Sequence, residues 1–126
     1  LAKHFEYTRK QSMQLASKMR YISAQFNALL ENDLWLTNAG HANRMARMLA
    51  DQLREVPGVE ITQKVETNGV FAILPPEAIE RLLRKYFFYV WDGSRHEVRW
   101  MTAFNTTEGD IEAFVSALRD AMESNH

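Results

Sequence analysis

The stretch PGVEITQKVETNGVFAILPP, Pro57 to Pro76, is where the periodicity of the chain changes from helical to extended. Pro57-Gly58 interrupts the preceding helical pattern, because proline followed by glycine is a strong turn signal. Beyond it, apolar and polar residues alternate from Val59 to Thr62, and a short apolar run covers 70–74. Both patterns are typical of strands. Asn68-Gly69 between them is a favoured hairpin dipeptide, so the sequence predicts an antiparallel strand pair that the double proline ends.

The residues before this stretch predict helix, since they contain a single glycine and no proline. Within Ala42–Val56, apolar residues recur at steps of three and four, which marks one buried helical stripe. Glu31-Asn32-Asp33 resembles a helix end followed by a new cap, so a break is expected there. We expect residues 1–56 to form a helical segment that leads into the rest and makes an interface. Residues 57–126 are expected to form a small C-terminal domain.

The segment after the double proline predicts a third helical region. Pro76 suits the first position of a helix over Glu77–Lys85. The apolar residues of this helix that we expect to face inward are Ile79, Leu82 and Leu83.

Two more strands and a closing helix complete the expected order. Tyr86–Trp91 predicts a buried strand and Val98–Phe104 the last strand, with a turn at Asp92-Gly93. Asn105 to Glu108 has the spacing of a capping box at the start of the closing helix. The inward face of that helix is expected to carry Ile111, Phe114, Val115, Leu118 and Met122. Long helices followed by β-β-α-β-β-α predict an α+β fold, with a small, mostly antiparallel sheet backed by helices.

Composition excludes several function classes. Fifteen Lys and Arg against sixteen Asp and Glu give a net charge of -1, which does not favour a nucleic-acid or anionic-membrane partner. No apolar run approaches the roughly 20 residues of a membrane span. The absence of cysteine excludes disulfides and thiolate catalysis, and is compatible with a cytoplasmic location. The chain begins at Leu1 instead of methionine, so we expect it to be a piece of a longer protein.

Motifs for metal or nucleophilic chemistry are missing from the sequence. The four histidines show no close ligand spacing, so no metal site is expected. No serine lies in a nucleophile-elbow motif, and the glycines are scattered singly instead of forming a phosphate-binding loop.

Two basic features remain. Lys18 and Arg20 lie on a helix in which small, polar and apolar residues mix; they could meet an anion such as a phosphate or could be solvated cations. Arg99 lies in a strand with Met101 and Ala103 as same-face neighbours, where a cation is costly unless it reaches water or an anion. Its fork of donors suits a carboxylate in two-point contact. Spacing alone favours a salt bridge to Glu97, Asp92 or a helix carboxylate.

Five segments carry a family resemblance: LASKMRYISAQFNALLENDLWLTNAGHANRMARMLADQL, PGVEI, ETNGVFAILP, FYVWDG and VRWMTAFNTTEGDIEAF. In this order they resemble the C-terminal part of low-specificity L-threonine aldolases and their β-eliminating lyase relatives. These are fold-type I enzymes that depend on pyridoxal phosphate. The resemblance extends from near Leu1 to about Leu118, and several motifs in register are far more specific than any single motif.

The resemblance implies that this chain is the small domain with the helix that leads into it. In the family, the lysine that carries the cofactor lies upstream in the large domain, so no catalytic residue is expected in this chain, and the chain alone is expected to be inactive. Arg99 in VRWMTAF matches the arginine that binds the α-carboxylate of the amino-acid substrate. Arg20 in SKMR matches an arginine near the cofactor phosphate; Lys18 would assist it, although many relatives have glycine there. Asn68 matches a position whose role is structural.

The implied activity is cleavage of the Cα–Cβ bond of threonine or allo-threonine to glycine and an aldehyde, by a cytoplasmic homo-oligomer (dimer or tetramer). An enzyme of the same superfamily that eliminates the β-substituent remains an alternative. A third possibility, from another class, is a non-catalytic α+β module that dimerises through its N-terminal helix.

Overall fold

The computed structural model describes residues 2–13 and 16–123. The chain divides into two compact units, Leu1–Leu36 and Thr37–His126. The division falls near the start of helix α3 (Leu34–Arg54), so most of α3 belongs to the same unit as the sheet. The sequence instead suggested a division after residue 56, which stays a prediction for the domains of the whole protein.

The first unit is helical, as the sequence predicted. A short 3-10 turn (η1, Ala2–His4) is followed by helices α1 (Phe5–Gln11) and α2 (Met19–Leu30). Neither α1 nor α2 has a buried residue among those described, so apolar side chains of α2 such as Phe26 are exposed within this unit. The predicted helix break is confirmed at η2 (Glu31–Asp33), where Asn32 has positive φ and separates α2 from α3.

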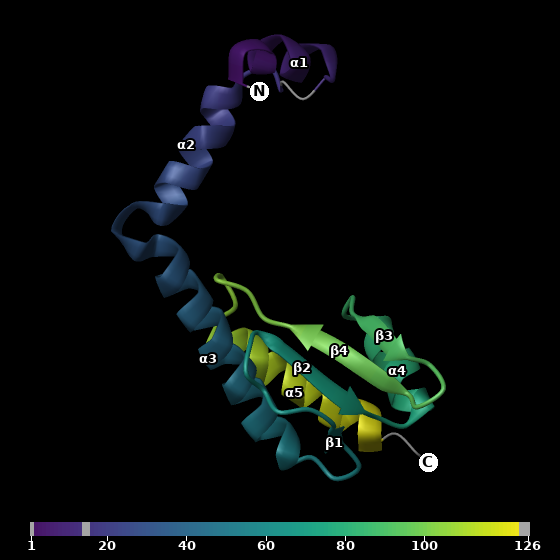
Figure 1. Cartoon of the computed structure of the whole chain (residues 1–126). Helices are drawn as coiled ribbons and strands as arrows, with labels where there is room; N and C mark the ends of the chain where they lie inside the picture. The colour runs from purple at the N-terminus through teal and green to yellow at the C-terminus, as the bar shows by residue number, and fades with distance from the viewer. Residues whose placement is uncertain (1, 14–15, 124–126) are drawn as a thin grey trace. The chain divides into compact units, whose positions relative to one another are not determined.

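The second unit contains a four-stranded sheet (Figure 1). Its strands are β1 (Glu60–Ile61), β2 (Gly69–Ile73), β3 (Tyr89–Asp92) and β4 (Glu97–Met101). Their order in the sheet is β1-β2-β4-β3, and each neighbouring pair is antiparallel. The small antiparallel sheet and the α+β class are therefore as predicted.

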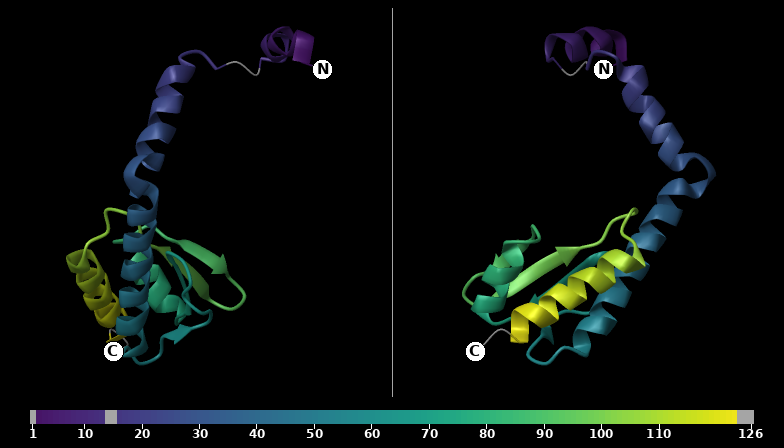
Figure 2. Two further views of the ribbon diagram at one scale, coloured as in Figure 1. Left: turned by 60° about the vertical axis from the view of Figure 1, so that its left-hand side comes forward. Right: turned by 180° about the vertical axis from the view of Figure 1, so that it is seen from behind.

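Helices cover one face of this sheet. Alternate residues of the two central strands, Val70 and Ala72 on β2 and Val98 and Trp100 on β4, are buried. They form one core with residues of α3, of α4 (Pro76–Leu83) and of α5 (Glu108–Glu123). Seen from behind in Figure 2, α5 lies in front of the strands, and Figure 1 looks onto the opposite side.

That opposite side, the open face, carries the other alternate set of strand residues. Its side chains include an arginine, three aromatic rings and a thioether, and they come from three neighbouring strands. The members of the open face used below are Phe71, Tyr89, Trp91, Arg99 and Met101. No helix of the second unit covers this face in the described part of the chain (Figures 1 and 2).

The predicted pairing of the first two strands is confirmed, but the predicted turn is wrong. Glu60 pairs with Ile73, so the connection between β1 and β2 is long and Gly69 already belongs to β2. Asn68 instead links the residue before β2 to the residue after β4, because its side-chain nitrogen donates to the carbonyl oxygen of Thr102 at 2.8 Å. The structural role expected for Asn68 agrees with this contact.

The strand predicted over residues 86–91 as buried is shorter and largely exposed. It begins at Tyr89, and the exposed fractions of Tyr89 and Trp91 are 58% and 54%. The reason is its position, because β3 is an edge strand and only one side of it pairs. Before the strand, Phe88 is buried and Phe87 is 84% exposed.

Two smaller expectations are also corrected. Leu83 is 42% exposed because it ends α4, whereas Ile79 and Leu82 are buried as expected. The last strand ends at Met101, before the predicted Phe104.

The closing helix is capped by a different residue from the one predicted. Thr107, and not Asn105, caps α5: its hydroxyl accepts from the backbone N–H of Asp110 at 3.1 Å. The carboxylate of Asp110 accepts in return from the backbone N–H of Thr107 at 2.8 Å. This reciprocal arrangement is a capping box shifted by two residues from the predicted one. The backbone and side-chain hydrogen bonds from Thr107 lower the pKa of Asp110.

Candidate functional site

Arg99 lies at the middle of β4, the strand that pairs with both β2 and β3. Its cross-strand neighbours are Phe71 on β2 and Tyr89 on β3. Because β4 is a central strand, the backbone of Arg99 is fixed by ladders on both sides. The side chain is half-buried and belongs to the open face of the sheet.

Aromatic rings surround this cation. The guanidinium carbon of Arg99 lies 4.8 Å from the ring centroid of Trp91 and 5.4 Å from that of Tyr89. Both distances are within the approximately 6 Å over which a ring attracts a cation. Trp91 is packed edge-on against Phe71, with 5.4 Å between ring centroids. The arginine is thus held by two side chains of β3, one of which also packs against Phe71 of β2.

Carboxylates do not neutralise Arg99 within the described part of the chain. Glu97, two residues earlier on the same face, is buried and its carboxylate accepts a hydrogen bond from the hydroxyl of Thr62. Asp92 accepts from the backbone and the hydroxyl of Ser94, and these hydrogen bonds lower its pKa. Among residues 2–13 and 16–123, no ion pair joins Arg99 to a carboxylate. The salt bridge that spacing alone favoured does not form among the described residues.

One donor of Arg99 is left without a partner. Its Nε is buried and has no hydrogen-bond acceptor among the described residues. A buried donor without an acceptor costs about 1–3 kcal/mol, and more when it is charged. The side chain as a whole is only half-buried, so an incoming group can approach it from the open face. A half-exposed guanidinium with an unmet donor suits a carboxylate in two-point contact.

The other two predicted site residues lie in the first unit. Lys18 is the N-cap residue of α2, with φ of 61° and ψ of 35° and no side-chain capping hydrogen bond. Arg20, in the first turn, has its guanidinium carbon 5.1 Å from the ring centroid of Tyr21 and donates to the Tyr21 hydroxyl at 3.4 Å. Both cations are exposed within this unit. A left-handed backbone of this kind favours glycine, so lysine is an unusual residue at this position.

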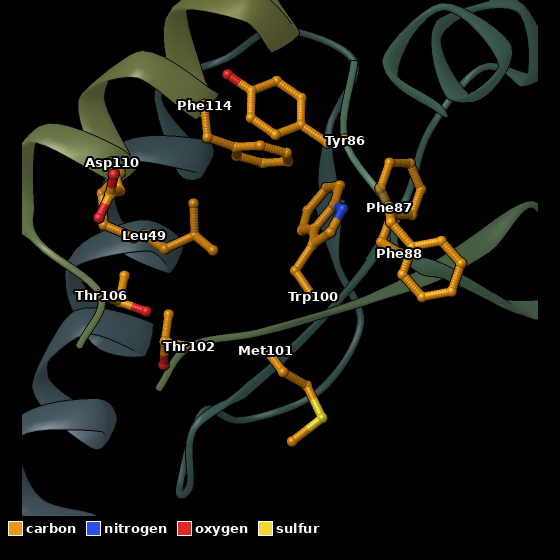
Figure 3. A pocket seen from close by; sticks show the side chains of 11 residues that line it. Leu49, Tyr86, Phe87, Phe88, Trp100, Met101, Thr102, Thr106, Asp110 and Phe114 are labelled. Atoms are coloured by element: carbon orange, nitrogen blue, oxygen red, sulfur yellow. The ribbon is translucent and has the colours of Figure 1, made fainter. Parts of the chain in front are cut away.

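A pocket of about 210 Å³ lies on the helix-covered side of the sheet (Figure 3). Its walls come from α3, β4, α5 and the segment before β3, and most of them are apolar. Trp100, a buried member of this lining, has its indole Nε1 without a hydrogen-bond partner in the described part of the chain. None of the three predicted site residues lines this pocket.

The sequence did not reveal the rings that hold Arg99. The sequence placed Tyr89 and Trp91 in a buried strand, so their rings were interpreted as core residues. In the structure β3 is an edge strand, and both rings are exposed. The signal that was present is the alternation of Tyr89 and Trp91, which places both on one face.

Two features are absent from residues 2–13 and 16–123. No group of three or more His, Asp or Glu side chains there could hold a metal ion. Nor does that part of the chain include a helix of the length and hydrophobicity that a bilayer crossing requires.

Comparison with known proteins identifies relatives over nearly the whole chain. A low-specificity L-threonine aldolase of a Pseudomonas species is 40% identical over 125 residues, 98% of this chain. One of Pseudomonas aeruginosa is 45% identical over 121 residues, 95% of this chain. The chain belongs to the low-specificity L-threonine aldolase family. It spans about a third of the length of these relatives, 36% and 34% respectively. No model of a known protein family matches the sequence.

Solved structures support the same assignment. A threonine aldolase of Leishmania major superposes on 78% of this chain with a TM-score of 0.66 and 25% identity, over 29% of its own chain. An inhibitor-bound glycine decarboxylase (P-protein) of the glycine cleavage system also has a TM-score of 0.66, with 26% identity, over 78% of this chain and 24% of its own. The second unit of this threonine-aldolase-family chain has the expected fold of a fold-type I small domain.

Proposed function

We propose that this chain is the C-terminal domain of a pyridoxal-phosphate-dependent lyase that cleaves the Cα–Cβ bond of β-hydroxy-α-amino acids. Threonine and allo-threonine are the proposed substrates, and glycine and an aldehyde the products. The observation that carries this proposal concerns Arg99: its side chain is half-exposed, lies against two rings, and forms no ion pair with a carboxylate of the described residues. Membership of the threonine aldolase family supplies the reaction class.

Arg99 would bind the α-carboxylate of the substrate. A guanidinium offers parallel N–H donors that match the two carboxylate oxygens, and such charge-assisted pairs are about twice as strong as neutral hydrogen bonds. Fixing the carboxylate restricts rotation of the bound amino acid and so determines which bond at Cα is aligned for cleavage. Arg99 would therefore orient the substrate and would transfer no proton.

Arg20 and Lys18 would contact the phosphate of the cofactor. Both side chains are exposed cations, and they lie at the N-terminus of α2, where backbone N–H groups and the helix dipole favour an anion. These residues therefore fit a phosphate group. When bound, pyridoxal phosphate supplies an electron sink for the negative charge that develops at Cα. The lysine that carries it would come from another part of the full-length protein, so this chain alone would be inactive.

The proposal extends to assembly and location. The full-length protein would be a homo-oligomer, and the exposed apolar residues of α2 provide a surface suited to contacts with other parts of the enzyme. It would act in the cytoplasm on small amino acids.

An assay of the full-length protein with threonine, allo-threonine and phenylserine tests the proposed reaction. We expect equal amounts of glycine and the matching aldehyde from at least one of these substrates. Formation of a keto acid and ammonia instead would assign the enzyme to β-elimination. The 126-residue chain is the matched control, and we expect it to show neither turnover nor the visible absorbance of bound cofactor. A coloured, active chain would overturn the domain assignment.

A further inference from the structure

We propose that Trp91 and Tyr89 are positioning residues that hold Arg99 for the substrate carboxylate without neutralising its charge. This inference rests on the proposed function, in which Arg99 binds the α-carboxylate. It assigns a role to two side chains of the edge strand β3 that a packing role does not explain, because both are more than half exposed.

A β-bulge distinguishes Trp91 from the other residues of β3. Tyr89 pairs with Arg99 and Val90 with Val98, but the next pair is Asp92 with Glu97. Trp91 is therefore the extra residue of the bulge and has no partner of its own on β4. Bulges re-aim side chains and are frequent beside functional sites. Here the ring of the bulged residue lies over the guanidinium, with its centroid 4.8 Å from the guanidinium carbon.

A second ring limits the freedom of Trp91. Phe71, on the opposite side of β4, meets Trp91 edge-on with an interplanar angle of 79°. Because Phe71 is the cross-strand partner of Arg99 on β2, the Phe71–Trp91 contact joins the strands on either side of β4 at the position of the arginine. Such edge-to-face pairs are favourable beyond the area they bury, so Phe71 restrains the ring of Trp91.

The chemical nature of these partners is what suits Arg99 to an anionic ligand. A carboxylate partner would supply both a negative charge and acceptors, and a substrate would have to displace it. An aromatic ring attracts the cation but carries no net charge. One donor of Arg99, its buried Nε, has no acceptor among the described residues. The rings thus order a flexible side chain in advance, which reduces the entropy lost on binding.

Replacement of Trp91 by leucine should weaken amino-acid binding through Arg99. A cation–π contact at an exposed site contributes about 0.5–1 kcal/mol, so we expect the dissociation constant for glycine to rise about twofold to fivefold. Trp91→Phe keeps a ring and should show a smaller rise. Tyr89→Leu should resemble Trp91→Leu. Phe104→Leu is the matched control. Phe104 is also an exposed aromatic residue, with 66% of its surface accessible, but among the described residues its ring makes no cation–π contact.

The experiment is calorimetric titration of the cofactor-loaded, full-length enzyme with glycine and with glycinamide, which lacks the carboxylate. We expect Trp91→Leu to weaken binding of glycine and to leave that of glycinamide unchanged. The same substitution is made in an Arg99→Ala background, where we expect no further loss because the ring acts through the arginine. A general structural defect would affect both ligands and would add to the loss caused by Arg99→Ala.

The outcomes separate this inference from the proposed function. If Arg99→Ala weakens glycine binding but Trp91→Leu and Tyr89→Leu do not, the positioning role is wrong and the carboxylate role of Arg99 stands. Losses that add in the double variant, or that affect glycinamide equally, also overturn the positioning role. If Arg99→Ala leaves glycine binding unchanged, the proposed role of Arg99 fails and the inference fails with it.

Discussion

Arg99→Lys tests the proposed site most directly, because it keeps the positive charge and changes the shape of the cation. Lysine offers a compact ammonium in place of a planar fork, so it cannot reproduce a two-point contact with a carboxylate. It also cannot maintain the same contacts with the rings of Trp91 and Tyr89, whose centroids lie 4.8 Å and 5.4 Å from the guanidinium carbon. The substitution therefore separates charge from geometry.

The size of the effect follows from these contacts. One lost charge-assisted hydrogen bond costs about 1.5–3 kcal/mol, and each weakened ring contact at an exposed site about 0.5–1 kcal/mol. Because the terms share one side chain, they are not fully additive. We expect a total of about 2–4 kcal/mol, which corresponds to an increase of about 30-fold to 1000-fold in the dissociation constant of the amino acid.

The assay is steady-state kinetics of the full-length enzyme with threonine, together with the absorbance spectrum of the bound cofactor. KM should rise and kcat/KM should fall by the expected factor, while the spectrum of the enzyme without substrate is unchanged. Arg95→Lys is the matched control, since Arg95 is an exposed arginine in the connection between β3 and β4. A rise in KM of less than about threefold for Arg99→Lys, which corresponds to about 0.7 kcal/mol, would refute the two-point contact.

Three further predictions concern the scaffold and are measured by urea denaturation of the 126-residue chain. Thr102→Val removes a hydroxyl that donates to the Ala42 carbonyl at 2.7 Å and should destabilise the fold by about 1–2 kcal/mol, whereas Thr102→Ser should not. Gly58→Ala places a side chain at φ of +83° and 2.7 Å from Met122 Cε, and should cost about 1–2 kcal/mol. Asp110→Asn should destabilise the chain at pH 7, and this difference should vanish as pH falls below 3.8, because the lowered pKa of Asp110 stabilises the folded state only while the carboxylate is ionised.

Each of these three has a result that would contradict its physical reason. Equal losses for valine and serine at position 102 would show that packing, and not the hydroxyl, matters there. A neutral Gly58→Ala would mean that the turn can move away from positive φ. A difference between Asp110 and asparagine that does not shrink as the pH falls below 3.8 would show that the carboxylate is not the stabilising group.

The order of elements was predictable because it depends on local signals. Proline and glycine mark the end of α3 and the start of α4, and the change from steps of three and four to alternation marks the sheet. The break at Asn32 was predictable for the same reason, since asparagine tolerates positive φ. The Asn68-Gly69 turn was not, because Asn68 forms a long-range hydrogen bond with the Thr102 backbone that no local pattern encodes.

The position of β3 within the sheet could not be predicted from the sequence either. Tyr86–Trp91 has the apolar run of a buried strand, yet β3 lies at the edge, where the same residues are exposed. Whether a strand lies at the edge or the centre of a sheet depends on which strands pair. That pairing depends on contacts between residues far apart in the chain. An aromatic run is therefore compatible with a core strand and with a strand whose rings serve a ligand site.

The sequence showed that Arg99 is an unusual cation among apolar neighbours, but it did not show which side chains contact it. Alternation puts Glu97 and Arg99 on the same face, which made a salt bridge the economical expectation. In the structure Glu97 accepts from Thr62 on the far side of β2, and Arg99 turns to the rings of β3. Glu97 and Arg99 therefore do not pair with each other. Because the two rings in contact with Arg99 are neutral, its positive charge remains available to a ligand. An arginine paired with Glu97 would be a weaker receptor for a carboxylate, so the separation of these two side chains is the feature of the open face on which the proposed function depends.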